Sequence, residues 1–270
     1  DFTLNALYAE MDGSLFDPLH GLDDCLARRV RFIGEPAQRI AEDRLRVFRF
    51  FRFSASHGKE QLDRDGLAAC VAAAGTLGNL AAERIGAEMR KMLGLPRVAK
   101  TLRVMREAGI LGLSAETVAL LHAHERRARR PGFHARLALI GSQGDPGQLQ
   151  RMWRLSNDDV AAAASILAAA RLIMDFRLNE AAYRYPAAIA DAVDVAATLA
   201  NWGDAGRLAV VEQLQRLDVP RFPLRGNDLL SLGMPPGRAV GLELERLELA
   251  WIESGFALDR EALLGMVARP

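Results

Sequence analysis

The cluster Glu42-Asp43-Arg44-Leu45-Arg46 holds the side chains of this chain that are best suited to chemistry. Apolar residues recur among charges over residues 40–53 without Gly or Pro, so the sequence predicts one helix there. Asp43 and Arg46 would then project from one face, three residues apart. A carboxylate accepts hydrogen bonds and a guanidinium donates them. The pair would match the amino group and ring nitrogen of adenine or cytosine, and mismatch guanine and uracil.

The competing interpretation of this cluster is a simple ion pair on a helix surface. Such a pair stabilises a helix by only about 0.2–0.5 kcal/mol and needs no ligand. For an isolated E-D-x-x-R sequence this would be the preferred explanation. The motifs around the cluster favour nucleotide recognition instead.

Four further segments accompany the cluster in a fixed order along the chain. They are D-F-T-L-N at residues 1–5, D-P-x-x-G-x-D-D at 17–24, E-R-I-G-A-E-M-R-K-M-L at 83–93 and L-R-G-N-D-L-L…G…P-G at 224–237. Together with E-D-x-x-R they closely resemble motifs of the bacterial class II tRNA nucleotidyltransferase and poly(A) polymerase family, the CCA-adding enzymes. The first segment is similar to motif B, the second to motif C, the cluster to motif D and the third to motif E. The resemblance is strong over residues 1–95, fair over 222–245 and diffuse between them.

The resemblance implies template-independent nucleotidyl transfer to the 3′ end of tRNA, with CTP and ATP as substrates and CCA as the added sequence. The family carries a Gly-Gly pair and two metal-binding carboxylates upstream of motif B, and nothing similar occurs in this chain. We therefore expect a C-terminal fragment in which Mg²⁺ belongs to the missing head. Because nucleotidyl transfer needs that metal, we expect the chain to be inactive alone, with no catalytic and no metal-binding residue of its own.

By resemblance, Asp43 accepts from the exocyclic amine of the incoming base and Arg46 donates to its ring acceptor. Glu42 is expected to hold Arg46 in orientation. Arg49, another turn along, is expected to face the phosphates or the same network. These four residues form the core of the predicted nucleotide-binding site.

Asp1 and Asn5 complete the predicted nucleotide-binding set. The resemblance implies that they face the ribose and triphosphate, whereas strand-end or turn capping would explain both without a ligand. Asp17 and Asp24 match motif C, for which the resemblance implies a flexible joint. Turn and helix-cap roles explain these two equally well.

Motif E contributes Glu83, Arg84, Glu88 and Lys91 to a predicted helix that we expect to support the base-recognition helix. A carboxylate in a first turn also complements the helix dipole.

Residues 124–130 form the most basic stretch of the chain. Arg126, Arg127, Arg129 and Arg130 are candidates for RNA phosphate contacts. A solvated helix C-terminus, favoured by the helix dipole, explains them as well.

Composition sets broad limits on the class of protein. The chain has 270 residues, 50% of them hydrophobic, and a net charge of +1, so it is globular and any RNA-binding surface is a local patch. Two cysteines, Cys25 and Cys70, and no signal peptide favour the cytoplasm. No apolar run reaches the ~20 residues of a membrane span; the longest, residues 160–174, reads as a buried helix.

The predicted fold is mainly α, a helical array with a short β-hairpin at the N-terminus formed by residues 7–10 and 14–17 around Asp12-Gly13. We expect a head remnant at 1–24, a neck at 25–95, a body at 96–220 and an RNA-binding tail at 221–270. The remaining predicted helices are 62–74, 78–93, 97–108, 115–129, 134–140, 146–154, 157–174, 178–182, 186–201, 204–218, 226–232 and 236–253.

Two functional alternatives stay open. A poly(A) polymerase, or an enzyme that adds only A or only CC, uses nearly the same motifs. A non-catalytic helical RNA-binding scaffold could keep the motifs as packing residues. The partner in each case is tRNA or another RNA 3′ end, and the sequence indicates neither a membrane partner nor an oligomeric state.

Overall fold

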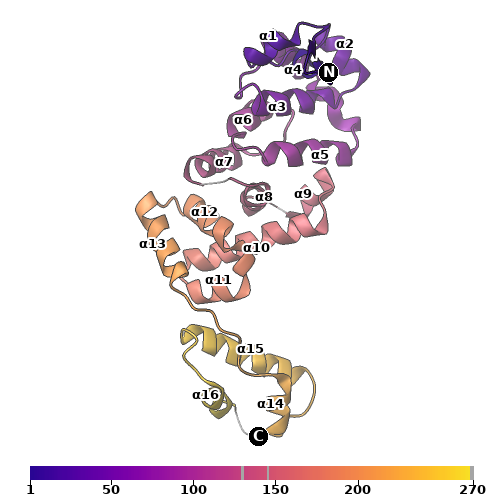
Figure 1. The fold of residues 1–270 in the computed structure, drawn as a ribbon. Coiled ribbons are helices and arrows are strands. Elements are labelled where there is room, and N and C mark those ends of the chain that lie inside the picture. The colour runs from indigo at the N-terminus through magenta and orange to yellow at the C-terminus, as the bar shows by residue number, and fades with distance from the viewer. Residues whose placement is uncertain (129–130, 145, 268–270) are drawn as a thin grey trace. The chain divides into compact units, whose positions relative to one another are not determined.

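The computed structural model describes residues 1–128, 131–144 and 146–267. The chain divides into two compact units, Asp1–Leu167 and Ala168–Pro270, and the fold is mainly helical as predicted (Figure 1). Each unit is described by itself. The finer division into head remnant, neck, body and tail stays a prediction.

The first unit begins with a short 3-10 helix and a hairpin and continues as helices. Its elements are η1 (Thr3–Asn5), β1 (Tyr8–Ala9), β2 (Leu15–Phe16), α1 (Gly21–Leu26), α2 (Pro36–Glu42), α3 (Arg46–Ser56), α4 (Arg64–Ala73), η2 (Ala74–Asn79), α5 (Ala82–Leu93), α6 (Ala99–Glu107), α7 (Ala115–Arg127), α8 (Phe133–Ser142) and α9 (Pro146–Trp153). Helix α10 (Asn157–Met174) begins in this unit and ends in the second.

The regular elements of the second unit are all helices among its described residues. Its elements are α11 (Leu178–Arg184), η3 (Pro186–Ala188), α12 (Ile189–Leu199), α13 (Asp204–Gln215), α14 (Gly226–Ser231), α15 (Arg238–Glu253) and α16 (Arg260–Gly265). The predicted helix at 186–201 is thus divided into η3 and α12. Helix α16 was not predicted. Within the described ranges, no helix combines the length and apolar character that a membrane crossing requires.

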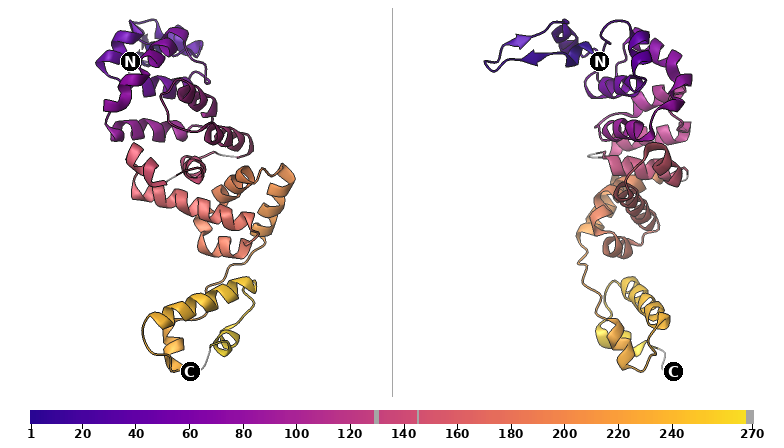
Figure 2. Two further views of the ribbon diagram at one scale, coloured as in Figure 1. Left: turned by 180° about the vertical axis from the view of Figure 1, so that it is seen from behind. Right: turned by 90° about the vertical axis from the view of Figure 1, so that its right-hand side faces the viewer.

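The predicted hairpin is confirmed, although its strands are shorter than expected. Strands β1 and β2 pair antiparallel, with Tyr8 opposite Phe16 and Ala9 opposite Leu15. Gly13 takes a φ of +86° in the turn, a conformation that glycine adopts without steric cost. The hairpin projects away from the helices of the first unit (Figure 2, right).

The single helix predicted over residues 40–53 is wrong. Helix α2 ends at Glu42, Asp43 is extended with φ −149° and ψ 105°, and α3 begins only at Arg46. The Asp43 carboxylate accepts a hydrogen bond from the Leu45 amide at 3.1 Å. Such a local side-chain bond to the backbone competes with helical hydrogen bonding, and here it separates the two helices.

Helix α3 is the centre of the first unit's core. Phe50 and Phe51 are fully buried, and Phe50 stacks on Phe32 with ring centroids 5.4 Å apart. Phe2, also fully buried, packs against Phe32 and Phe53. The opposite side of α3 packs on α5, so this helix is fixed from both sides.

A glycine allows α5 to approach α9 closely. A Cβ atom at Gly86 would overlap the carbonyl oxygen of Trp153 and lie 2.8 Å from its carbonyl carbon. Since the obstacle is backbone, it cannot rotate away. Gly86 lies inside the predicted motif E, so part of that motif serves helix packing.

The second unit buries a separate apolar cluster around Trp251, which is 2% exposed. The predicted helices at 226–232 and 236–253 are confirmed as α14 and α15, which are joined by a turn containing Gly233 (φ +91°) and Gly237 (φ +140°). Asp228 accepts from the Arg225 amide at 2.7 Å and from Arg260 at 2.7 Å. The cluster comprises Leu224, Leu229, Leu247, Trp251, Ile252, Leu263 and Val267.

We predict that Gly86→Ala lowers the free energy of unfolding by about 2 kcal/mol, because overpacking forces the α5 and α9 backbones apart. Urea denaturation followed by circular dichroism measures the change. Gly78→Ala is the matched control, since a Cβ there meets nothing within 4 Å. Equal stability of the two variants would contradict the close α5–α9 contact.

Candidate base-recognition site

The N-terminal segment reaches the site through a β-bridge. Phe2 pairs antiparallel with Phe32, the Thr3 amide donates to the Arg31 carbonyl at 3.0 Å, and the Ile33 amide donates to the Asp1 carbonyl at 3.1 Å. Because Phe2 is fully buried, these contacts fix the position of Asp1 beside α3.

Asp1 joins two arginines of α3. Its Oδ1 accepts from Arg46 Nε at 2.8 Å, and its Oδ2 lies 2.6 Å from Arg49 Nη1. The Asp1 side chain is only 9% exposed. The structure therefore brings together three of the predicted site residues, which are up to 48 positions apart in the sequence. It places Arg49 in the same network as Arg46, one of the two predicted alternatives.

Glu42 contacts Arg46, as predicted. Arg46 Nη1 donates to Glu42 Oε2 at 2.8 Å and to the Arg39 carbonyl at 2.6 Å. Arg39 Nη1 also donates to the same Glu42 oxygen at 2.5 Å, so Glu42 is itself held. With Nε on Asp1, two of the three guanidinium nitrogens of Arg46 are engaged. Arg46 Nη2 has no hydrogen-bond partner among the described residues.

Asp43 is anchored by a different partner. Its Oδ2 accepts from Arg84 Nη2 of α5 at 2.8 Å, while Oδ1 accepts from the Leu45 amide. Burial by itself raises the pKa of Asp43, but the hydrogen bonds from Arg84 and Leu45 and the charges of Arg84 and Arg46 hold it below its ordinary value. The carboxylate is 30% exposed, and its two oxygens have about four acceptor positions. Acceptor capacity remains for a ligand.

Asn5 and Asp17 make local contacts in the structure. Asn5 Oδ1 accepts from the Phe2 amide at 3.0 Å. Asp17 accepts from the Gly21 and Leu22 amides at the start of α1. The capping interpretation of Asn5 and Asp17 thus has structural support, and the ligand role of Asn5 stays a prediction.

Asp24 is a fully buried carboxylate that ties three segments together. It accepts from Thr3 Oγ1 at 2.5 Å, Arg29 Nε at 2.6 Å and Arg31 Nε at 3.1 Å. Burial raises its pKa, but these hydrogen bonds and the two arginine charges bring it below the ordinary value. Asp24 therefore anchors the strand-like segment at 31–33, which in turn holds Phe2.

The motif E helix supports α3 through charges as well as packing. Glu88 of α5 is 8% exposed at its side chain and accepts from Arg52 Nε at 2.5 Å. Lys91 Nζ lies 3.3 Å from the other Glu88 oxygen. Glu83 is exposed and lies 3.4 Å from Arg154. Arg84 has the most direct part, because it is the partner of Asp43. No local sequence pattern predicts this pair.

The basic stretch at 124–130 is only partly described. Arg126 is exposed and donates to His122 Nδ1 at 3.2 Å, and Arg127 is half-buried at the end of α7. Arg129 and Arg130 lie outside the described residues. Their predicted contacts with RNA therefore stay predictions.

Arg136, which sequence analysis missed, is a completely buried cation next to that stretch. It pairs with Glu125 at 2.8 Å and donates to the carbonyls of Leu93, Leu95 and Pro96. Buried charges require pairing of this kind; Nη1 and Nη2 supply it here, whereas Arg136 Nε has no hydrogen-bond partner among the described residues. Arg136 thus joins α7, α8 and the end of α5.

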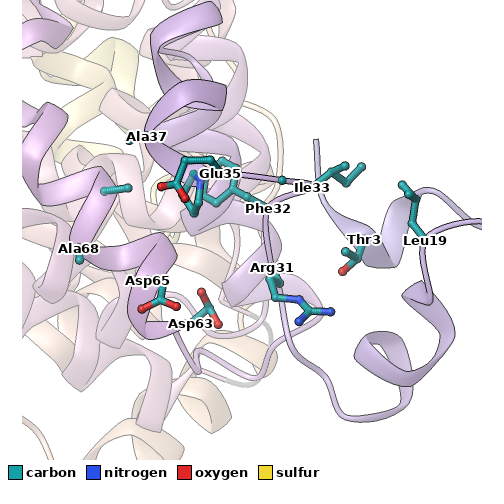
Figure 3. Close-up of a pocket in the computed structure, with 13 residues that line it drawn as sticks. Thr3, Leu19, Arg31, Phe32, Ile33, Glu35, Ala37, Asp63, Asp65 and Ala68 are labelled. Atoms are coloured by element: carbon teal, nitrogen blue, oxygen red, sulfur yellow. The ribbon is translucent and has the colours of Figure 1, made fainter.

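A cleft of about 670 Å³ lies near the base-recognition site but is separate from it. Thr3 and Leu19 lie on one side and Ala37 and Ala68 on the other, with Arg31 below (Figure 3). None of the predicted nucleotide-binding residues lines it. Among the described residues, no three His, Cys, Asp or Glu side chains are grouped to hold a metal ion.

Comparisons with known proteins agree with these motifs. A family model described as "Probable RNA and SrmB-binding site of polymerase A" matches residues 61–113. The CCA-adding enzyme of Limosilactobacillus fermentum is 31% identical over 277 residues, covering 98% of this chain and 69% of the relative. The mitochondrial CCA tRNA nucleotidyltransferase 1 of Mus musculus is 28% identical over 287 residues, covering all of this chain and 65% of the relative.

Solved structures of CCA-adding enzymes also match this chain. The CCA-adding enzyme of Bacillus stearothermophilus in complex with CTP matches with a TM-score of 0.77 and 26% identity, over 94% of this chain and 68% of that one. A Thermotoga maritima CCA-adding enzyme complexed with tRNA matches with a TM-score of 0.63 at 15% identity, over 98% of this chain and 70% of that one, which shows the fold alone.

The helical fold and the motifs thus define this chain as one of the tRNA nucleotidyltransferase class. It belongs to the CCA-adding enzyme family, on the strength of its identity and coverage with the Limosilactobacillus relative. The chain spans about two thirds of the length of the relatives that it matches.

We predict that Arg84→Ala raises the pKa of Asp43, because the variant removes both a hydrogen bond and a positive charge that favour the carboxylate. Asp43 then loses its charge at a higher pH on acidification than in the wild type. A ¹³C NMR titration of carboxyl-labelled aspartate measures this. Arg44→Ala is the control, since Arg44 bonds to Thr76 instead; an equal shift in both variants would refute the pairing.

Proposed function

We propose that the intact protein adds C, C and A to the 3′ end of tRNA from CTP and ATP, without a template. In this proposal the present chain supplies nucleotide selection and RNA binding. CCA addition from these two nucleotides requires a site that accepts adenine and cytosine and rejects guanine and uracil. Asp43 and Arg46 are the residues to which we assign this selection.

The assignment of base selection to Asp43 and Arg46 rests on how these two side chains are held. They lie on either side of the α2–α3 turn. Each is anchored by protein partners that leave one hydrogen-bonding position free. Arg46 Nη2 is available as a donor, and the Asp43 carboxylate keeps acceptor capacity. Adenine and cytosine each present an amino donor beside a ring acceptor. The anchors reduce the rotamer entropy that binding would otherwise cost.

The other residues of the site hold Asp43 and Arg46 in position. Asp1 and Glu42 hold the Arg46 guanidinium from two sides, and Arg84 holds Asp43. Fixed side chains discriminate better than mobile ones, because a mobile pair can adapt to the wrong base. The Bacillus stearothermophilus relative is in complex with CTP, which supports nucleotide binding by the intact protein. When Mg²⁺ is bound by the family's head residues, it supplies charge stabilisation at the transferring phosphoryl group.

We also propose that the intact protein works in the cytoplasm. Cys25 and Cys70 are both free thiols, which suits a reducing environment. A curated relative is mitochondrial, so the compartment requires its own measurement by fractionation.

The activity is tested by incubating the intact protein with magnesium, labelled CTP and ATP, and a tRNA that lacks its CCA end. Sequencing of the products is expected to show addition of C, C and A and then a stop. A long A tail identifies a poly(A) polymerase, and addition of only A or only CC identifies a partial enzyme. No extension contradicts the proposal and favours the RNA-binding scaffold.

We predict that Asp43→Ala and Arg46→Ala in the intact protein reduce discrimination against UTP and GTP by about 10- to 100-fold, since a bidentate base contact contributes about 1–3 kcal/mol. RNA affinity should change little. The measurement is a competition assay with all four nucleotides, alongside RNA binding. Arg44→Ala, which removes a neighbouring charge, is expected to keep wild-type selectivity. Unchanged selectivity in both site variants would falsify the assignment.

A further inference from the structure

Charged side chains around the start of α3 form an alternating row of cations and anions. Asp1 lies between Arg49 and Arg46, and Glu42 lies between Arg46 and Arg39. Three guanidinium groups therefore share two carboxylates, with Arg46 at the centre. We call these five residues the charge row. Arg39 is the member of the charge row that lies outside the predicted nucleotide-binding set.

Both acceptors of Arg46 Nη1 depend on Arg39. One acceptor is the main-chain carbonyl of Arg39, at 2.6 Å. The other is Glu42 Oε2, at 2.8 Å, and the same oxygen accepts from Arg39 Nη1 at 2.5 Å. A guanidinium has five N–H donors, two of them on each Nη, so these two contacts occupy Nη1. The nitrogen of Arg46 that remains available to a ligand is Nη2.

The Arg39 carbonyl also contacts the second base-recognition residue. The Asp43 amide donates a long hydrogen bond of 3.4 Å to it at the point where α2 ends. One oxygen thus touches the backbone of Asp43 and the guanidinium of Arg46. Arg39 is therefore the residue of α2 that contacts both of them.

Glu42 needs a second partner to stay on Arg46. The Glu42 side chain is 42% exposed, more than any other side chain of the charge row. A carboxylate this open to water gains little from a single ion pair and can rotate away. Arg39 supplies the second partner, and within the described part of the chain its guanidinium donates to Glu42 alone. Arg39 thus restricts Glu42 to the rotamer that contacts Arg46.

A simpler explanation of Arg39 is a favourable charge at a helix end. Arg39 lies in the last turn of α2, where a positive charge interacts well with the helix dipole. That role predicts a change in stability when the charge is removed. It predicts no change in the choice between cytosine and uracil, and this difference makes the two explanations separable.

We propose that Arg39 is a positioning residue for base selection. Its guanidinium fixes Glu42, and Glu42 fixes Arg46 with Nη2 directed toward the base. Arg39 acts through Glu42 and does not contact the nucleotide itself. This inference rests on the proposed function for the identity of the base, and it adds to the site a residue that the sequence analysis did not select.

The test compares Arg39→Met, Glu42→Gln and the double variant in the intact protein. The readout is the ratio of kcat/KM for CTP to kcat/KM for UTP, alongside the melting temperature. Arg39→Met is expected to lower this ratio about threefold to tenfold, less than Asp43→Ala does, because the Arg39 carbonyl still holds Arg46 Nη1. The double variant should match Glu42→Gln, since two residues that act through one contact are not additive.

Two further variants serve as controls. Arg39→Lys keeps the charge but lacks the planar fork, so it should restore part of the ratio. Arg44→Met removes a charge from the same turn, but Arg44 bonds to Thr76 instead, and this variant should keep the wild-type ratio. A lower melting temperature of Arg39→Met with an unchanged ratio would support the helix-dipole role and overturn the positioning role.

A second readout is independent of catalysis. Arginine ¹⁵N NMR of the intact protein without nucleotide measures rotation of the Arg46 guanidinium, which should be faster in Arg39→Met than in Arg44→Met. Faster rotation in a protein that adds no CCA would support the positioning of Arg46 and contradict the proposed function alone. Unchanged rotation would overturn the role of Arg39, even where Arg46→Ala alters selectivity as the proposed function requires.

Discussion

The first unit depends on neutralising the arginines of helix α3. One side of this helix is buried aromatic core, and its arginines at positions 46, 49 and 52 border that core. Charges at the edge of an apolar core require partners, because burial removes part of the water that would otherwise solvate them. Asp1, Glu42 and Glu88 supply these partners from three different segments. The ion pairs therefore help to hold the N-terminal segment, α2 and α5 around α3, together with the bridge at Phe2 and the packing of α3 on α5.

The same ion pairs connect the fold of the first unit to base recognition. Arg46 receives so many contacts that its guanidinium is held in one orientation, and the remaining Nη2 faces a defined direction. The break at Asp43 has the same effect on the carboxylate, because the turn directs it toward Arg84 rather than along the helix. A continuous helix would have placed the pair on one face without these anchors. The turn is therefore part of the proposed site.

The sequence predicted the helical periodicity well and the long-range contacts poorly. Helix α10 has the predicted bounds, Asn157–Met174, because no Gly or Pro interrupts this stretch. The break at Asp43 was missed, since a single side-chain bond to a backbone amide leaves no trace in hydrophobic periodicity. The Glu42–Arg46 contact was expected within one helix, but it forms across the α2–α3 turn. The Asp43–Arg84 pair joins residues 41 positions apart, and no local pattern encodes such a pair.

The central claim is that Asp43 and Arg46 contact the base directly. The most direct measurement is a crystal structure of the intact protein with bound CTP. The account predicts a hydrogen bond from the cytosine amino group to the Asp43 carboxylate and one from Arg46 Nη2 to a ring acceptor, with the contacts to Asp1, Glu42 and Arg84 retained. A cytosine bound away from the α2–α3 turn, with both side chains still paired only to protein, would contradict it.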